Sequence, residues 1–99
     1  MSTSSTEKIL EKLRELKPLI KKRYRAGQIE LFGSYIREEQ NHGSDIDILV
    51  DFEDGADLFD LMGLAIFLEE NLKQKVDVIP KRALRPEIRE AILKEAVSV

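Results

Sequence analysis

The stretch "LFGSYIREEQNHGSDIDILVDF", residues 31–52, has two apolar ends and a charged middle. Its final part "DIDILVDF" (45–52) is typical of a β-strand, as is "QIELF" (28–32). The pair Gly33-Ser34 marks a turn after the first strand, and Asp45 and Asp47 stand at the start of the second. Two acids at the start of so apolar a strand require a chemical explanation. The rest of the chain limits which functions can supply it.

The composition indicates one folded domain over residues 1–99. The chain is 42% hydrophobic and 35% charged, which suits a small globule with one modest core. Its net charge of −3 argues against a general nucleic-acid binder, so we expect no direct nucleic-acid partner. The absence of cysteine excludes disulfides and favours a reducing, cytoplasmic location. No signal peptide and no apolar run of about 20 residues is present, so no membrane association is expected.

Hydrophobic periodicity predicts the order α-β-α-β-α-β-α. The expected elements are a helical segment 5–25, strand 28–32, a short helical stretch "YIREE", strand 45–52, helix 58–72, strand 75–79 and helix 86–97. We expect Ser4 and Glu7 to form a capping box, Pro18 to kink or divide the first helix, and Ala26-Gly27 to end it. Strands separated by helices predict an α/β (α+β) fold, a small mixed sheet flanked by helices, with the motif-bearing core over 28–99.

The aspartate pair favours a divalent cation. Residues two apart on a strand project from the same face about 6–7 Å apart, so Asp45 and Asp47 lie side by side. Their carboxylates repel each other unless a cation lies between them, and such oxygen ligands suit Mg²⁺. The alternative is a solvated, charged strand edge, which is the commoner reason for such a pair. An EF-hand is excluded because Val50 stands where its glycine is needed.

The Gly33-Ser34 pair favours a phosphate-binding turn. A glycine at the end of a strand lets phosphate oxygens approach the backbone, and a following helix offers free N–H groups. Ser34 adds a hydroxyl, and Arg37, about one turn further on, can balance phosphate charge. By itself Gly-Ser is an ordinary turn. Followed after ten residues by Asp-x-Asp, it predicts a phosphate-binding turn that faces a metal-binding pair.

These elements, together with Asp77 in "KVDVI", resemble the minimal nucleotidyltransferases of the DNA polymerase β superfamily. The resemblance runs from about Ile29 to the C-terminus and implies a polymerase-β-like nucleotidyltransferase fold. Members of this size are similar to the antitoxins of toxin–antitoxin pairs whose toxin is a HEPN ribonuclease, and several transfer AMP from ATP to a toxin tyrosine. The family often has Arg-Gly where this chain has Arg37-Glu38, so its phosphate-binding turn is expected to be less open.

The resemblance implies a role for each residue of the motif. Asp45, Asp47 and Asp77 would be the catalytic acids and the ligands of two Mg²⁺ ions, and Asp77 would also help to deprotonate the acceptor hydroxyl. Nucleotide binding is expected from Gly33, Ser34, Arg37 and Ser44, although Ser44 could equally shape only the turn before the strand. His42 is expected to be a solvated loop residue, and Tyr35 a packing residue.

Helix 58–72 is apolar on almost every side over its first three turns. A surface helix normally has one apolar stripe, so either neighbouring elements cover it on both sides or part of it faces another chain. We favour a partner, either the cognate HEPN-type toxin or a second copy of this chain. The function expected is Mg²⁺-dependent transfer of AMP from ATP to a hydroxyl on the toxin. The alternative is a non-catalytic antitoxin that neutralises its partner by binding, and three aligned acids favour the enzyme.

Overall fold

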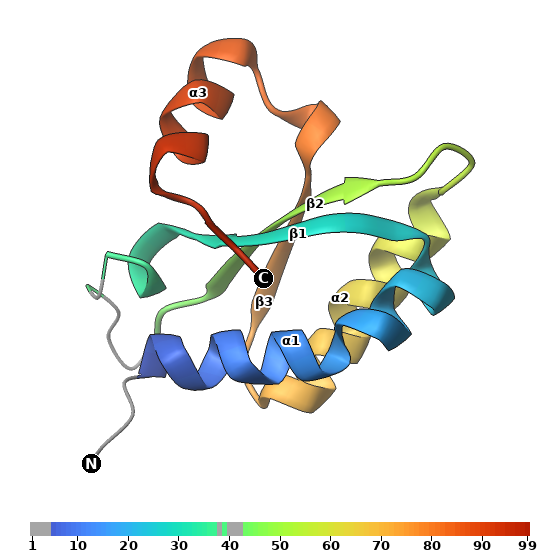
Figure 1. Ribbon diagram of the computed structural model, residues 1–99, viewed down its shortest axis with the longest axis horizontal. Helices are drawn as coiled ribbons and strands as arrows, with labels where there is room; N and C mark the ends of the chain where they lie inside the picture. Colours follow the sequence, from blue (N-terminus) through green and yellow to red (C-terminus); the bar gives the residue numbers. More distant parts are fainter. Residues whose placement is uncertain (1–4, 38, 40–42) are drawn as a thin grey trace.

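The computed structural model describes residues 5–37, 39 and 43–99, which form a four-stranded mixed sheet with helices on both faces (Figure 1). The elements are α1 (Ser5–Tyr24), β1 (Ala26–Phe32), the short 3₁₀ turn η1 (Gly33–Tyr35), β2 (Ile46–Phe52), α2 (Leu58–Leu72), β3 (Val76–Pro80), the 3₁₀ turn η2 (Lys81–Ala83), α3 (Pro86–Glu95) and β4 (Val97–Ser98). This arrangement confirms the predicted α+β class and the mixed sheet.

The strands lie in the order β3-β2-β1-β4. β1 is antiparallel to β2 and to β4, whereas β2 and β3 are parallel and are joined by α2 as a crossover helix. The β2–β3 register pairs Asp47 with Asp77, and the β1–β2 register pairs Phe32 with Asp47. The strand pairing alone therefore brings the Gly33 turn and both strand acids to one end of the sheet.

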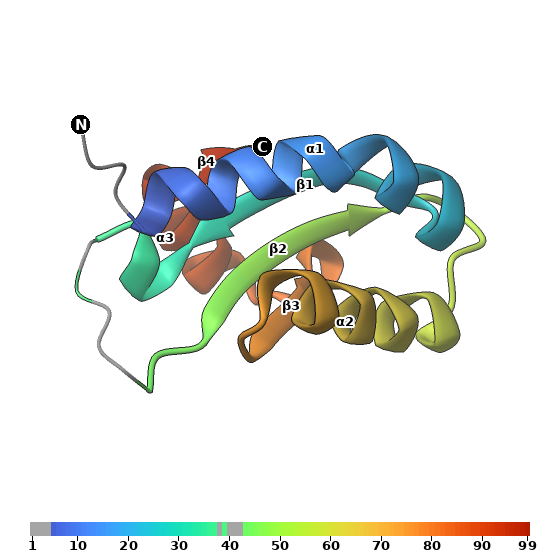
Figure 2. The ribbon, with the colours of Figure 1, turned by 90° about the horizontal axis from the view of Figure 1, so that it is seen from below.

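α1 and α2 cover one face of the sheet, and α3 lies on the other (Figure 2). The core forms between the sheet and the first two helices, where Leu13 of α1 and Leu64 of α2 are fully buried against β1 and β2. Ile46, Ile48 and Val50 of β2 are also fully buried. Because side chains alternate along a strand, Asp47 projects from the opposite face, the one on which α3 lies.

The first helix differs from its prediction in two respects. Pro18 lies within one α1 of 20 residues and does not divide it, because Leu13 and Ile20 on either side are both buried in the core and hold the helix in place. Ala26-Gly27 does not end the helix either. The chain turns at Arg25, which has a left-handed φ of 54°, and Ala26 already begins β1. Ser4 of the expected capping box lies outside the described residues.

The C-terminal prediction missed a strand. The helix expected over 86–97 ends at Glu95, because Ala96 is extended (φ −64°, ψ 142°), and Val97–Ser98 then pairs with β1. The free edge of β1 offers backbone hydrogen-bond partners to Val97–Ser98, and a helix that continued to residue 97 would not use them. In the described part of the stretch "YIREE" (35–39), which leaves out Glu38, the structure has the end of the 3₁₀ turn η1, Gly33–Tyr35, and a turn in place of the predicted helix. The strand expected over 75–79 forms one residue later, as β3.

α2 has the predicted bounds 58–72, and a capping box between Asp57 and Asp60 sets its start. Leu64 and Leu68 are buried, but one side of the helix is uncovered. That side, the exposed α2 face, consists of Leu58, Phe59, Met62 and Ile66, with Phe59 83% exposed. Among the described residues, no helix is long and apolar enough to span a bilayer.

Candidate active site

Three aspartates gather at the start of β2 and β3. Asp47 and Asp77 are register partners on adjacent parallel strands, and Asp45 immediately precedes β2. Asp45 and Asp77 are exposed, whereas Asp47 is half-buried. Burial raises the pKa of Asp47, and the negative charges of Asp77 and Asp45 raise it further. This mutual repulsion means that a cation bound between the carboxylates would relieve unfavourable charge.

The three side chains do not form a finished metal site. Within the described ranges, no three acidic or histidine side chains converge closely enough to hold an ion as they stand. The chemistry of the donors nevertheless fits a hard cation, because carboxylate oxygens are the ligands that Mg²⁺ prefers. Asp45 and Asp77 are exposed, so ions in solution can reach their carboxylates.

Gly33 lies in contact with the Asp47 carboxylate. A Cβ atom built on Gly33 would lie 2.2 Å from Oδ2 of Asp47, and the φ of Gly33 is +81°, a conformation that favours glycine. Glycine is therefore required here for two independent reasons, backbone conformation and the space taken by Asp47. The contact places the predicted phosphate-binding turn directly against Asp47, one of the predicted metal-binding acids.

The backbone of the turn is closed by hydrogen bonds to its own carbonyls. Gly33 O accepts from the N–H of Ile36 and of Arg37, both at 3.1 Å. Tyr35 is 3% exposed; its carbonyl accepts from the Thr6 hydroxyl and its own hydroxyl accepts from Gln74 Nε2 at 2.7 Å. Tyr35 is thus the packing residue that was predicted, and it anchors the turn to the core.

Ser34 is half-buried, and its hydroxyl makes no hydrogen bond within the part of the chain that the structure describes. Ser44 is half-buried and lies directly before Asp45. Ser34 thus offers a hydroxyl beside the acids for a phosphate oxygen. Glu38 and His42, which were considered from the sequence, lie outside the described residues.

Arg37 is held by two carboxylates. Its Nε donates to Oε2 of Glu39 at 3.1 Å, and its Nη1 donates to both carboxylate oxygens of Glu95 at 3.1 and 3.2 Å. The hydrogen bond to Glu39 makes the largest contribution to raising the pKa of Arg37 above its ordinary value, and the hydrogen bond to Glu95 makes the next largest. The positive charge of Arg37 in turn opposes the rise in the pKa of Asp47, so Arg37 acts on the same site.

Sequence reasoning missed Glu95. Its Oε1 also accepts a hydrogen bond from the backbone N–H of Gly33 at 3.3 Å. Glu95 is 58 residues from Arg37 and 62 from Gly33, in the last turn of a helix with two other acids. No local pattern distinguishes it from its neighbours, so only the strand pairing of β1 with β4 reveals it.

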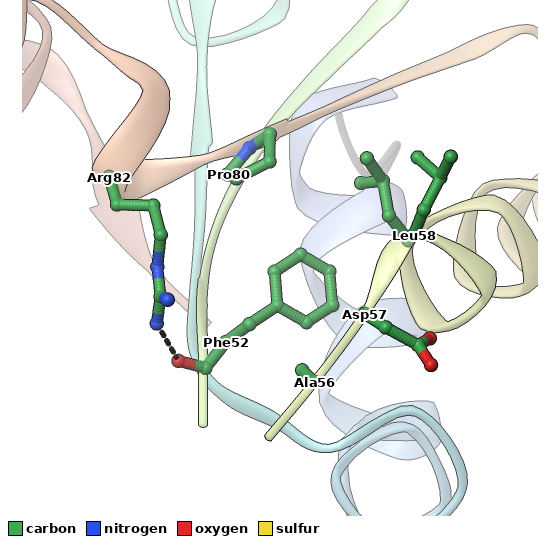
Figure 3. A pocket seen from close by; sticks show the side chains of 7 residues that line it. Phe52, Ala56, Asp57, Leu58, Pro80 and Arg82 are labelled. Carbon is green, nitrogen blue, oxygen red and sulfur yellow. Dashed lines mark hydrogen bonds between the residues drawn. The ribbon is translucent and has the colours of Figure 1, made fainter. Parts of the chain in front are cut away.

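Two of the hollows in the described part of the chain help to locate the site. One, of about 420 Å³, adjoins the site and is lined by Arg37, Glu95 and, from α3, Glu87, Ile88, Ala91 and Ile92. The other, of about 260 Å³, lies at the opposite ends of β2 and β3, where Phe52, Pro80 and Leu58 form much of its wall (Figure 3). There Arg82 points toward the end of β2 and donates to the carbonyl of Phe52 at 3.0 Å. Of these two hollows, the first adjoins Arg37 and Glu95, whose charges act on Asp47.

Comparison with known proteins agrees with this fold. The chain is 36% identical over its full length to the protein adenylyltransferase MntA of Thermococcus cleftensis, and the match covers all of both chains. A solved minimal nucleotidyltransferase superposes with a TM-score of 0.85 at 34% identity, again over all of both chains. The fold thus occurs in a relative of the same length.

Two further solved structures are toxin–antitoxin complexes. A complex with AMP-PNP matches with a TM-score of 0.68 at 29% identity, over 95% of this chain and 71% of the other. A complex of the MNT antitoxin with a tri-AMPylated HEPN toxin from Shewanella oneidensis matches with a TM-score of 0.59 at 27% identity, over 94% of this chain and 66% of the other. The family model of the nucleotidyltransferase domain matches residues 7–99, and the chain therefore belongs to the nucleotidyltransferase domain family.

Proposed function

We propose that this protein is a Mg²⁺-dependent protein adenylyltransferase that transfers AMP from ATP to a hydroxyl of a HEPN-type toxin and thereby acts as its antitoxin. The observation that carries the proposal is the contact between Gly33 and the Asp47 carboxylate, which joins a phosphate-binding turn to a metal-binding acid. The relative named protein adenylyltransferase MntA and the MNT complex with an AMPylated HEPN toxin support the choice of nucleotide and partner.

The acids fit a magnesium-dependent reaction. Mg²⁺ bound by Asp45, Asp47 and Asp77 would neutralise the triphosphate and stabilise the developing charge on the attacking and leaving oxygens. Asp77 is exposed at the start of β3, where its carboxylate can accept the proton of an incoming hydroxyl. Asp47, the half-buried acid that lies against Gly33, would fix the position of the ion relative to the turn.

The turn and its neighbours would hold the nucleotide. The Ser34 hydroxyl can donate to a phosphate oxygen, and Gly33 lets that oxygen approach the backbone. Arg37 would balance charge on the outer phosphates or on the departing pyrophosphate, and Ser44 would contribute a further hydroxyl from the segment before Asp45. The 420 Å³ hollow beside Arg37, with apolar side chains from α3, leaves room for the rest of the nucleotide.

A non-catalytic antitoxin is the second candidate. The exposed α2 face favours it, because four large apolar side chains on one side of a helix are typical of a surface that another protein covers. The two functions are compatible, since an enzyme with a protein substrate also has to bind that protein. The register pairing of Asp47 with Asp77 favours catalysis, because a surface used only for binding has no need of aligned carboxylates next to a glycine turn.

The proposal is tested by incubating the cognate HEPN-type partner with ATP and Mg²⁺ and measuring its intact mass. We expect the wild-type protein to add one or more AMP units to the partner, and Asp47→Asn or addition of EDTA to abolish the transfer. Asp51→Asn is the matched control, since Asp51 is exposed on the same face of β2, four residues beyond Asp47. If the wild type silences its partner without adding mass, the non-catalytic function is the correct one.

A further inference from the structure

Glu95 occupies the position in the sheet that lies opposite Gly33. β4 pairs Val97 with Leu31 and Ser98 with Glu30, and the N–H of Val99 donates to the carbonyl of Ile29 at 2.9 Å. The same antiparallel register, continued by two residues toward the site, aligns Glu95 with Gly33. β4 covers only Val97–Ser98, so Glu95 lies just before it. No backbone carbonyl from a paired strand is therefore available opposite Gly33.

The side chain of Glu95 takes the place of that missing carbonyl. Its Oε1 accepts from the N–H of Gly33 at 3.3 Å, and the same carboxylate accepts from Nη1 of Arg37 at 3.1 and 3.2 Å. The Glu95 carboxylate thus holds both the N–H of Gly33, the first residue of the turn, and the guanidinium of Arg37. Its side chain is 29% exposed, so solvent competes less at Glu95 than at Glu39, which is 65% exposed.

The contact reaches Gly33 from the β4 side of the sheet. Backbone groups of alternate residues on a strand point to the same side, so the N–H of Gly33 points toward β4, as does the carbonyl of Ile29. The carboxylate of Asp47, in contrast, comes from β2, the neighbour of β1 on its other side. Glu95 therefore braces Gly33 from the β4 edge of the sheet, on the side of β1 opposite β2. Ser34, whose hydroxyl is available within the described part of the chain, follows directly after the braced residue.

We propose that Glu95 is a positioning residue of the nucleotidyltransferase reaction, which holds the Gly33 turn and the Arg37 guanidinium in the arrangement that receives the triphosphate. The inference rests on the proposed function, because it assigns Glu95 a role in binding ATP. It also explains why α3 remains near the site although none of its residues is buried: Glu95 at its C-terminal end and β4 just beyond connect it to the rest of the fold.

The test measures binding of Mg²⁺-ATP by calorimetry, and then KM and kcat of AMP transfer. Glu95→Ala removes both contacts, and we expect Mg²⁺-ATP binding to weaken roughly 10-fold, as for loss of a charge-assisted hydrogen bond. KM should rise by a similar factor while kcat changes less. Glu95→Gln keeps an oxygen that can accept from the Gly33 N–H but loses the charge, so it should recover part of the affinity. Glu90→Ala, an exposed acid on the same helix, is the matched control and should bind as the wild type does.

A second arm separates positioning from folding. The unfolding temperature and the hydrogen exchange of the Gly33 amide are measured for each variant, and Glu95→Gln should keep both near the wild-type values. In an Arg37→Ala background, Glu95→Ala should weaken binding less than it does in the wild type, because one of its two contacts is already lost. Glu95→Ala that binds Mg²⁺-ATP as tightly as the wild type, or more tightly, overturns the inference and leaves the proposed function intact. Wild-type protein that binds no Mg²⁺-ATP overturns the proposed function itself.

Discussion

Gly33→Ala tests the contact on which the proposed function depends. The substitution adds one methyl group, and the geometry puts its Cβ 2.2 Å from Oδ2 and 3.0 Å from Cγ of Asp47. No relaxation of the alanine itself removes this overlap, because its Cβ has no torsion that could move it. The Asp47 carboxylate therefore has to rotate away, which takes the acid out of the position it holds against the turn.

The cost to folding has two parts. An alanine at a φ of +81° costs about 1–2 kcal/mol relative to glycine, and forcing Asp47 out of its rotamer costs about 0.5–1.5 kcal/mol more. The sum, about 1.5–3.5 kcal/mol, corresponds to a decrease of roughly 6–28 °C in the unfolding temperature of a chain this size. The fold should therefore survive at room temperature, while binding of Mg²⁺-ATP is largely lost.

Gly55→Ala is the matched control for the backbone part. Gly55 has a φ of +92°, so alanine pays a similar conformational cost there, but its Cβ would meet only Nη1 of Arg25 at 3.3 Å, the end of a flexible side chain. We expect Gly55→Ala to destabilise the fold by about 1–2 kcal/mol and to leave nucleotide binding unchanged. The difference between the two variants isolates the effect of the Asp47 contact.

Urea unfolding and calorimetric titration with Mg²⁺-ATP measure the two effects. Combining Gly33→Ala with Asp47→Ala removes the carboxylate that the new methyl group meets, so the double variant should be more stable than the sum of the single changes by about 1 kcal/mol. Additive free energies of unfolding would mean that Gly33 and Asp47 are not in contact. Unchanged ATP binding in Gly33→Ala would mean that the turn does not receive the phosphates.

Three further outcomes are expected. Burial and neighbouring acids raise the pKa of Asp47 above its ordinary value of 3.8, so the folded state favours its protonated form, and stability is lost as the pH rises through the range between the ordinary and the raised pKa. Asp47→Asn should thus be at least as stable as the wild type at pH 7, with the advantage vanishing in urea titrations below the ordinary pKa. Asp77→Asn should bind Mg²⁺-ATP nearly normally but transfer AMP about 10²–10⁴-fold more slowly in the mass assay, and normal transfer would show that Asp77 is not the base. Phe59→Ser should leave the unfolding temperature unchanged, because Phe59 is 83% exposed, yet weaken the complex with the partner in analytical ultracentrifugation; an unaffected complex would place the partner elsewhere.

Local patterns in the sequence were sufficient for much of the fold. The bounds of α2 follow from its continuous apolar run and from Asp57 and Asp60 at its start, both of which act within a few residues. The alternation in "DIDILVDF" places Asp47 on the face opposite Ile46 and Ile48 because the period of a strand is two. The spacing between Gly33-Ser34 and the aspartates indicated the family, and the family match over residues 7–99 confirmed it.

The tertiary structure decided what depends on contacts between distant residues. Pro18 stays inside α1 because buried neighbours outweigh the local preference of proline, and Val97–Ser98 becomes a strand because β1 has a free edge. The contact of Gly33 with Asp47 and that of Glu95 with Gly33 and Arg37 arise only when β1 pairs with strands on both sides. The sequence also could not show which apolar residues of α2 form its exposed face. The apolar pattern of a helix is the same whether its own fold or another chain covers the side chains. Strand register, which forms across tens of residues, is the physical reason that these features become visible only in the folded chain.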